Sequence, residues 1–381
     1  TIAPFNPNIN TQPVGAVPGT GQTGGNIDLF SPDFKLPQVF KTNLAFDYKI
    51  PNSDGFILSG DYLYQKTINN IYYQNLNVNA PVGNLTGTGD DRPIYNRGAD
   101  ITGDYDRIIL ASNTSEGYTY NIVTTLSKSL KNGFQGSISH SFGDAFAIFD
   151  GTSSQNSSQW RGIENVNGKN SDLPLSRSNF SAGHRFTSNF SYEYQWNETL
   201  KTTFGVFYSG RQGLPTSYTY GGRAGRLQND DSRDYTSLIY VPLDANDINL
   251  TTNNWAELDA FLSSDSYLNS RRGQYAERNA TRGPWTNVID LKVSQDFKYQ
   301  DHTIQLSLDI FNFTNLINKN WGVVNFRRGQ SRFLNFEGFQ ADGTTPEFSF
   351  DPEDAANLDQ IDDSGLQSSR WQIQFGVRYS F

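Results

Sequence analysis

Three histidines are the residues of this sequence best suited to acid–base or metal chemistry, because imidazole titrates near neutral pH and binds transition metals. His140, His184 and His302 are far apart in the 381-residue chain, and we expect them to lie at different heights on their strands. The HExxH spacing of a helical zinc site is absent, and the chain has no cysteine. No nucleophile–base arrangement is discernible. We therefore expect no catalytic residues, no metal, no cofactor and no enzymatic activity.

Carboxylate clusters are the other possible metal ligands, because calcium prefers several oxygen donors. One cluster comprises Asp351, Glu353, Asp354, Asp359, Asp362 and Asp363. A second comprises Asp230, Asp231 and Asp234, interleaved with Arg226 and Arg233. Neither has the spacing of an EF-hand loop, so we interpret both as solvated acidic loops. The glycine cluster at 221–225 lacks a strand-to-helix context, which argues against a phosphate-binding loop.

A third group of charged residues alternates with apolar residues along the chain. Its members are Arg185, Glu193, Asp290, Lys292, Asp296 and Arg378. Side chains that face the water-filled lumen of a barrel either contact a plug or a solute, or simply keep the inner wall wet. Either role requires strands that hold these residues on one face.

Period-two alternation predicts such strands, because successive side chains on a strand point to opposite faces. The clearest pattern is at the C-terminus, where every second residue is apolar: Trp371, Ile373, Phe375, Val377, Tyr379 and Phe381. The same alternation recurs within 40–50, 186–196, 200–208, 289–297 and 304–310. One lipid-facing side and one wet side would explain the pattern, but a soluble β-sandwich would show it too.

The lengths of the connections distinguish these two folds. Short turns are predicted at 51–55, 131–133, 197–198 and 298–302. Long polar segments are predicted to be extracellular loops, at about 77–105, 147–182, 210–284 and 314–368. Compact soluble domains rarely contain several such loops, whereas outer-membrane barrels combine them with short periplasmic turns. We therefore predict an all-β fold, a transmembrane antiparallel β-barrel, with 1–35 as a further extracellular loop and 36–381 as barrel.

The number of strands indicates a part of a barrel. The pattern gives about nine strands if 106–130 is a single strand with a bulge at 113–117. Bacterial single-chain barrels have an even number of strands, and unpaired edges are costly in lipid. We therefore expect a larger barrel, closed by strands that this chain does not contain.

Composition agrees with a membrane barrel. Aromatic residues make up 14% of the chain, and a mean hydropathy of −0.58 is compatible because only alternate residues face lipid. The net charge of −9 argues against a nucleic-acid partner, which would need a basic surface. Six aromatic residues near predicted strand ends are expected at the membrane interfaces: Tyr192, Tyr194, Trp196, Trp285, Phe297 and Tyr299.

The predicted loops also contain aromatic residues: Trp160, Tyr218, Tyr220, Trp255 and Tyr267. They either grip a glycan or a peptide or pack large loops together, and the sequence does not distinguish these roles. The terminal aromatic strand, which ends on Phe381, is expected to be recognised by the barrel-assembly machinery through strand addition.

The order of several segments resembles the C-terminal barrel region of TonB-dependent outer-membrane receptors, in particular the Oar-like branch of Bacteroidota. These segments are 31–44, 113–118, 126–133, 283–297 (GPWTNVIDLKVSQDF) and 308–315 (LDIFNFTN), followed by the terminal strand. The resemblance implies a 22-stranded barrel in a Gram-negative outer membrane, of which this chain supplies roughly the last nine strands. The plug domain and the TonB-binding box of that family have no counterpart in this sequence.

The resemblance implies TonB-dependent transport of an unknown solute. The implied partners are outer-membrane lipid, TonB through the missing N-terminal part, the barrel-assembly machinery, and a surface lipoprotein or larger complex. One alternative is a related barrel that acts as a scaffold or accessory subunit of a secretion or assembly complex. Another is a secreted, soluble, β-rich adhesin.

Overall fold

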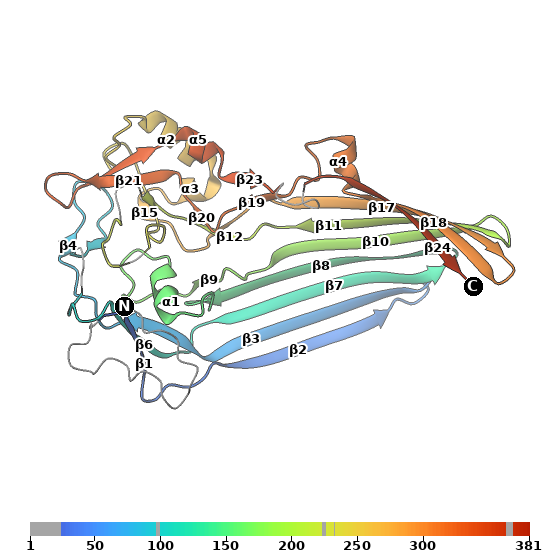
Figure 1. The fold of residues 1–381 in the computed structure, drawn as a ribbon, viewed down its shortest axis with the longest axis horizontal. Coiled ribbons are helices and arrows are strands. Elements are labelled where there is room, and N and C mark those ends of the chain that lie inside the picture. Colours follow the sequence, from blue (N-terminus) through green and yellow to red (C-terminus); the bar gives the residue numbers. More distant parts are fainter. Residues whose placement is uncertain (1–23, 97–99, 223–225, 232, 363–368) are drawn as a thin grey trace, which may run out of the picture.

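The computed structural model describes residues 24–96, 100–222, 226–231, 233–362 and 369–381. Its main feature is a 12-stranded, curved sheet (Figure 1). Long strands follow one another through this sheet, each antiparallel to the one before it. They are β2 (Gln38–Lys49), β3 (Phe56–Asn75), β7 (Tyr118–Lys131), β8 (Phe134–Ala147), β10 (Gly183–Gln195), β11 (Leu200–Arg211), β17 (Thr286–Tyr299), β18 (His302–Phe311) and β24 (Gln372–Ser380).

The two ends of the sheet differ in their connections. Short turns join β2 to β3, β7 to β8, β10 to β11 and β17 to β18, and they lie at the same end as the C-terminus (Figure 1). Asn132 and Gly133 have φ of 54° and 79°, as expected for the Asn-Gly pair of a tight hairpin. The long connections lie at the opposite end. We call these the turn end and the loop end.

The segment 106–130 forms two strands, β6 (Arg107–Thr114) and β7, that pair with β3 one after the other. Lys66 pairs with Tyr118 and Asn70 with Thr114, so three residues lie between the two pairs on each side. No residue is inserted, and the bulge predicted at 113–117 is therefore wrong. The irregularity lies in β3, where the pairing with β2 skips Ile68.

Part of the predicted loop 1–35 is a strand. In β1 (Asn26–Phe30), Asn26 pairs with Arg107 and Phe30 with Ala111, parallel to β6. This pairing lies at the loop end, where β6 would otherwise be an open edge of the sheet. Residues 1–23 lie outside the described part of the chain.

The sheet does not close on itself. Within the described residues, β2 pairs only with β3 and β24 only with β18, so each leaves one row of backbone groups without a neighbouring strand. Such edges are costly in lipid unless another strand covers them. None of the helices in the described ranges has the length and apolar character needed to cross a membrane.

At the loop end, the described residues of 76–106, 148–182, 212–285 and 325–362 form a folded region that we call the cap (Figure 1). Its elements are β4 (Gly83–Asn84), β5 (Pro93–Ile94), α1 (Asn156–Gly162), β9 (Ser176–Arg177), β12 (Pro215–Tyr218), β13 (Gly221–Gly222), β14 (Tyr240–Val241), α2 (Trp255–Ser264), α3 (Ser266–Ser270), β15 (Gln274–Tyr275), β16 (Thr281–Arg282), β19 (Asn325–Arg327), β20 (Gln330–Ser331), β21 (Leu334–Phe339), β22 (Pro346–Phe350), α5 (Pro352–Ala356) and β23 (Asp359–Ile361). The remaining helix, α4 (Phe313–Ile317), lies beside β17.

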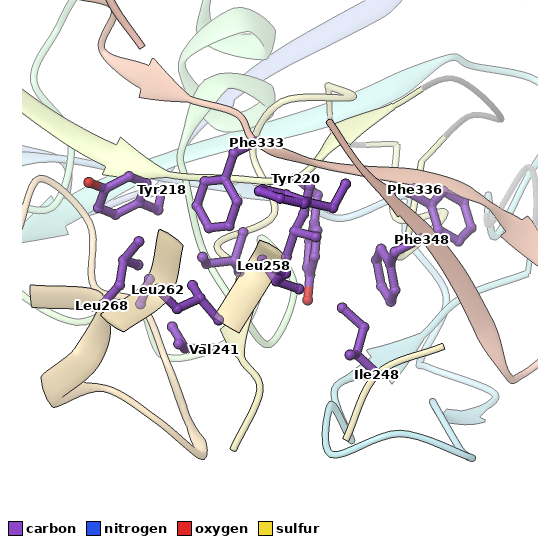
Figure 2. Packing of buried hydrophobic residues seen from close by; sticks show 14 of the residues in the cluster. Tyr218, Tyr220, Val241, Ile248, Leu258, Leu262, Leu268, Phe333, Phe336 and Phe348 are labelled. Atoms are coloured by element: carbon purple, nitrogen blue, oxygen red, sulfur yellow. The ribbon is translucent and has the colours of Figure 1, made fainter. Parts of the chain in front are cut away.

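The cap has its own hydrophobic core (Figure 2). Leu258 and Leu262 are one turn apart on α2, point to the same side and are fully buried. Asp265 then ends α2 and caps α3 by accepting hydrogen bonds from the backbone N–H groups of Tyr267 and Leu268. A second, smaller cluster, which includes Trp160, packs beside the loop-end part of β3 and beside β6.

Candidate functional site

The strand pairing sorts the sheet into an apolar face and a polar face. On β18 and β24, Ile304 pairs with Tyr379 and Leu306 with Val377, whereas the residues between them pair Gln305 with Arg378. The apolar face is strongly exposed: Val377 is 76% and Phe375 is 79% exposed. A soluble monomer rarely exposes so large an apolar surface, so this face needs an apolar environment.

The residues predicted for the terminal strand share this apolar face. Ile373, Phe375, Val377 and Tyr379 lie on β24, Trp371 directly precedes it and Phe381 follows it, and all six are exposed. Tyr379 also contacts β18, with its hydroxyl 2.7 Å from Nδ1 of His302 and its ring stacked on that imidazole. The strand is therefore anchored at the turn end by a polar contact as well as by its ladder.

The six aromatic residues predicted for the interfaces lie at both ends of the sheet and are exposed. At the turn end they are Tyr192, Tyr194, Trp196, Phe297 and Tyr299, and at the loop end Trp285. Trp196 donates a hydrogen bond from Nε1 to Oγ1 of Thr202 at 2.7 Å, so its polar edge has a partner while its ring stays exposed. The ring of Phe186, which was not among the residues predicted for the interfaces, has its centroid 6.1 Å from that of Trp285.

Two of the histidines lie together, contrary to the prediction of different heights. Nε2 of His140 is 3.1 Å from Nδ1 of His184, and their rings are stacked. The register of β8 and β10 explains this, because it pairs His140 with Phe186 and His184 with Phe142 on the apolar face. These phenylalanines stack on the two imidazoles. The long connection between the strands hid this proximity, and His302 lies apart at the turn end.

The charged residues predicted for the inner wall lie on the polar face, and several have partners there. Lys292 forms an ion pair with Asp309 at 2.8 Å. Lys201, which was not predicted, lies 3.4 Å from Asp296 and 3.9 Å from Glu193. Asp290 accepts a hydrogen bond from the backbone N–H of Asn312, and Arg378 pairs across the ladder with Gln305. Arg185 pairs across the ladder with another arginine, Arg211.

A family model described as an outer membrane beta barrel domain matches residues 1–331, which is most of the chain. The chain belongs to this family of outer membrane beta barrel domains. The protein is therefore located in the outer membrane, where the apolar face can meet hydrocarbon and the polar face can border water.

Solved structures of outer-membrane transporters are similar to this barrel domain. The outer membrane transporter YddB from Escherichia coli shares 13% sequence identity with a TM-score of 0.40, covering 93% of this chain and 34% of its own. The FrpB iron transporter from Neisseria meningitidis shares 10% identity with a TM-score of 0.20, covering 73% of this chain and 41% of its own. The chain thus spans well under half the length of either transporter. A comparison with curated proteins gave no match.

The cap of the barrel domain contains a cavity of about 590 Å³ between the connections 148–182 and 212–285. Its lining includes Glu164, Arg177, Tyr267, Tyr275 and Arg278. A second cavity of about 320 Å³ shares Glu164 and Arg278 with the first. The volume of the larger cavity suits a small molecule, and the shared residues form a charged wall between the two cavities.

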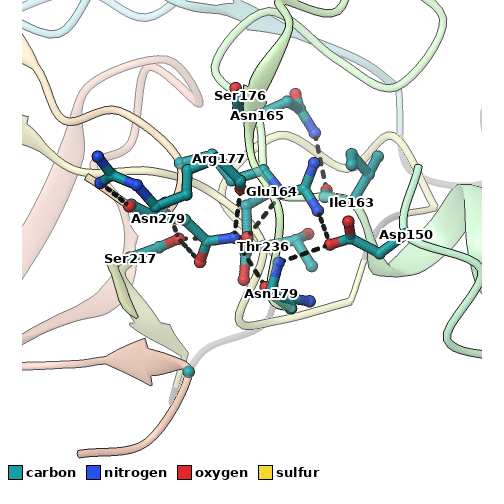
Figure 3. Close-up of polar contacts among 12 residues, drawn as sticks. Asp150, Ile163, Glu164, Asn165, Ser176, Arg177, Asn179, Ser217, Thr236 and Asn279 are labelled. Carbon is teal, nitrogen blue, oxygen red and sulfur yellow. Dashed lines mark hydrogen bonds and ion pairs between the residues drawn. The ribbon is translucent and has the colours of Figure 1, made fainter. Parts of the chain in front are cut away.

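The charged wall is built from buried ion pairs (Figure 3). Arg278 lies 2.6 Å from Oδ2 of Asp150 and 3.4 Å from Oε2 of Glu164, and all three side chains are at most 6% exposed. Gln330 donates a hydrogen bond to Oε1 of Glu164 at 2.6 Å. Buried pairs of this kind hold loops in one arrangement, because separating them would leave a charge without a partner. Nothing in the spacing of these residues identified them in the sequence.

A buried lysine lies close to this wall. Nζ of Lys169 donates hydrogen bonds to the carbonyl of Ile163 and, at 2.9 Å, to Oγ1 of Thr236. Burial disfavours its charged form and lowers the pKa of Lys169 to about 8. The cap therefore contains a group whose charge changes slightly above neutral pH.

The aromatic residues of the predicted loops mostly support packing. Trp160, Tyr218 and Tyr220 are at most 2% exposed and belong to the two cores. Trp255 and Tyr267 are partly buried and pack against the larger core. Of the two roles considered for these residues, the structure favours packing, and only Tyr267 also lines the cavity.

The acidic clusters have structural partners. Asp351 caps α5, and Asp359 forms a two-pronged ion pair with Arg327. Asp231 forms ion pairs with three arginines: Arg107, Arg161 and Arg226. Asp363 lies outside the described residues, as do 223–225 of the predicted glycine cluster. Within the described ranges, no group of three or more potential metal ligands comes together.

Proposed function

We propose that this chain forms part of the wall and the extracellular loops of a TonB-dependent transporter for a small polar solute. The observation that carries the proposal is the mainly polar face of the sheet, which lies opposite an exposed apolar face, together with a cap at the loop end that contains a cavity of about 590 Å³. The proposed dependence on TonB rests on the resemblance to Oar-like receptors.

In this proposal the open edges β2 and β24 pair with further strands of a barrel of about 22 strands. The loop end faces outward, and the turn end faces the periplasm. The barrel-assembly machinery binds the exposed edge of β24 by strand addition during biogenesis. TonB acts through a plug domain outside this chain, and a surface lipoprotein covers the cap. The role is not enzymatic.

Solute depletion from a defined medium tests this function. Wild-type cells, cells without this gene and cells without TonB would be grown in parallel, and the medium analysed by untargeted mass spectrometry. The proposal expects at least one polar solute that wild-type cells remove and that neither mutant removes. If both mutants deplete every solute as the wild type does, the transport function is wrong.

A scaffold role is the second candidate, and the folded cap favours it. Its hydrophobic core and the buried wall of Asp150, Glu164 and Arg278 give a rigid outer surface of the kind on which another protein can dock. The expected result is a loss of other outer-membrane proteins when the gene is deleted, with no such loss in cells without TonB. Family membership argues against the soluble adhesin.

A further inference from the structure

Two arginines face each other on the polar face of the sheet near the loop end. Arg185 on β10 pairs directly with Arg211 on β11. Both share this face with Glu193 and Lys201, which lie farther toward the turn end on the same two strands. Both arginine side chains are exposed, so their guanidinium groups extend from the wall rather than into the protein.

Like charges directly opposite each other destabilise an antiparallel pair unless an anion lies between them. Elsewhere on this face, cations have such partners, as Lys292 has in Asp309 and Lys201 in Asp296. Within the described part of the chain, neither arginine of this pair has an ion-pair or hydrogen-bond partner. Among the described residues, Lys41 and Arg378 on the same face also lack an ion pair, but each lies opposite a glutamine, whereas Arg185 and Arg211 lie opposite each other.

The ladder neighbours of the pair carry no carboxylate, and all of them carry hydroxyl groups apart from Val288, which pairs with Ser209. Arg185 pairs on its other side with Ser141, and Arg211 with Thr286. The next row toward the turn end pairs Thr187 with Ser209. On β17 the first acidic residue of this face is Asp290, four residues and about 13 Å along the strand from Thr286, and it already accepts a hydrogen bond from Asn312.

We propose that Arg185 and Arg211 form an anion subsite that takes a carboxylate or phosphate group of the transported solute. Two guanidinium groups on adjacent strands present planar N–H forks, which match the paired oxygens of both anions. Thr187 and Ser209, in the next row of the same face, carry hydroxyl groups that can donate further hydrogen bonds. The subsite rests on the proposed function, because a soluble anion reaches this wall only if the wall borders water.

The test uses the full-length protein in detergent, with citrate as a carboxylate probe and pyrophosphate as a phosphate probe. Titration calorimetry at low salt would compare the wild type with Arg185→Gln and Arg211→Gln. Lys41→Gln is the matched control, because Lys41 places one positive charge on the same face of β2, far from the pair. We expect each arginine variant to weaken binding of at least one probe about tenfold or more, and the control to bind like the wild type.

Access of water to the wall is measured separately with Ser209→Cys, since this chain has no cysteine of its own. A membrane-impermeant maleimide should label this position, and the bound probe should slow the labelling. Failure of labelling would refute a water-filled passage and with it the proposed function. Labelling without probe binding, or equal weakening by Lys41→Gln, would overturn the subsite alone. The probe that binds more tightly identifies the anion as carboxylate or phosphate.

Discussion

The sheet and the cap use the same kinds of residue in opposite ways. Phe375 in the sheet is 79% exposed, whereas Phe333 in the cap is fully buried among other aromatic rings. Charges differ as well: Lys292 pairs with Asp309 on an open wall, whereas Arg278 is buried between two carboxylates. The sheet relies on its ladder and on lipid, while the cap is organised like a small soluble domain. A single chain thus obeys two sets of packing rules, one at each end.

The largest predicted difference between the two regions is in the effect on stability of replacing one phenylalanine by alanine in each. Phe333→Ala should destabilise the cap by about 3–5 kcal/mol, because it opens a cavity in a packed core. Phe375→Ala should destabilise the barrel far less, because that side chain faces outward from the sheet and its loss opens no cavity in a packed core. Limited proteolysis of the loops in urea would report the cap, and heat-modifiable gel migration the barrel. Equal effects on both readouts would contradict the division.

Removing a cation from each region gives a comparable test for charge. Arg278→Met should cost about 3–5 kcal/mol, because Asp150 and Glu164 would stay buried without a partner. Lys292→Met should cost at most about 1 kcal/mol, because its side chain is 54% exposed to solvent. The same urea series measures both variants. A large loss of stability in Lys292→Met would show that this face of the sheet is less exposed to water than proposed.

The cap alone should depend on pH through Lys169. Its pKa is about 8 in the folded protein and near 10.5 in the unfolded chain, so between these values the unfolded state binds one more proton. The stability of the cap should therefore rise from pH 8 to 9.5, by up to about 2 kcal/mol. Lys169→Met should remove this rise, measured as the urea midpoint of loop proteolysis. A rise of the same size in Lys169→Met would assign it to another group.

The smallest predicted effect concerns the arginine pair of the wall. Arg185→Gln should stabilise the sheet by about 0.2–1 kcal/mol in the absence of an anion, because it removes a like-charge contact with Arg211. The temperature at which gel migration changes would report it. Arg378→Gln is the control, since Arg378 pairs with Gln305 and no like charge is relieved. A stabilisation of the same size in the control would point to the net charge of the wall instead.

The strands could be predicted because alternation and short turns are local. Every second residue from Ile373 to Tyr379 is apolar, and the pair Asn132-Gly133 marks a hairpin within two residues. The contact between His140 and His184 depends on the register across a long connection, which no local pattern fixes. The cap core joins residues as distant as Tyr220 and Phe348, and its helices are too short to show a clear period. Likewise, the sequence alone did not identify Arg211 as part of a candidate anion site, because its pairing with Arg185 depends on the strand register.

The strand β3 has a mechanical consequence. Its 20 residues span about 66 Å and join the turn end to the smaller core of the cap through Tyr73. Because β6 and β7 keep one register along it, their two ladders lie in line on that side, with a short gap at 115–117. A pull on the cap along the strand axis would load these bonds in shear and together, whereas a sideways pull would open them one at a time. The strand is therefore stiff in the direction along which a force would pass between the two sides of the membrane.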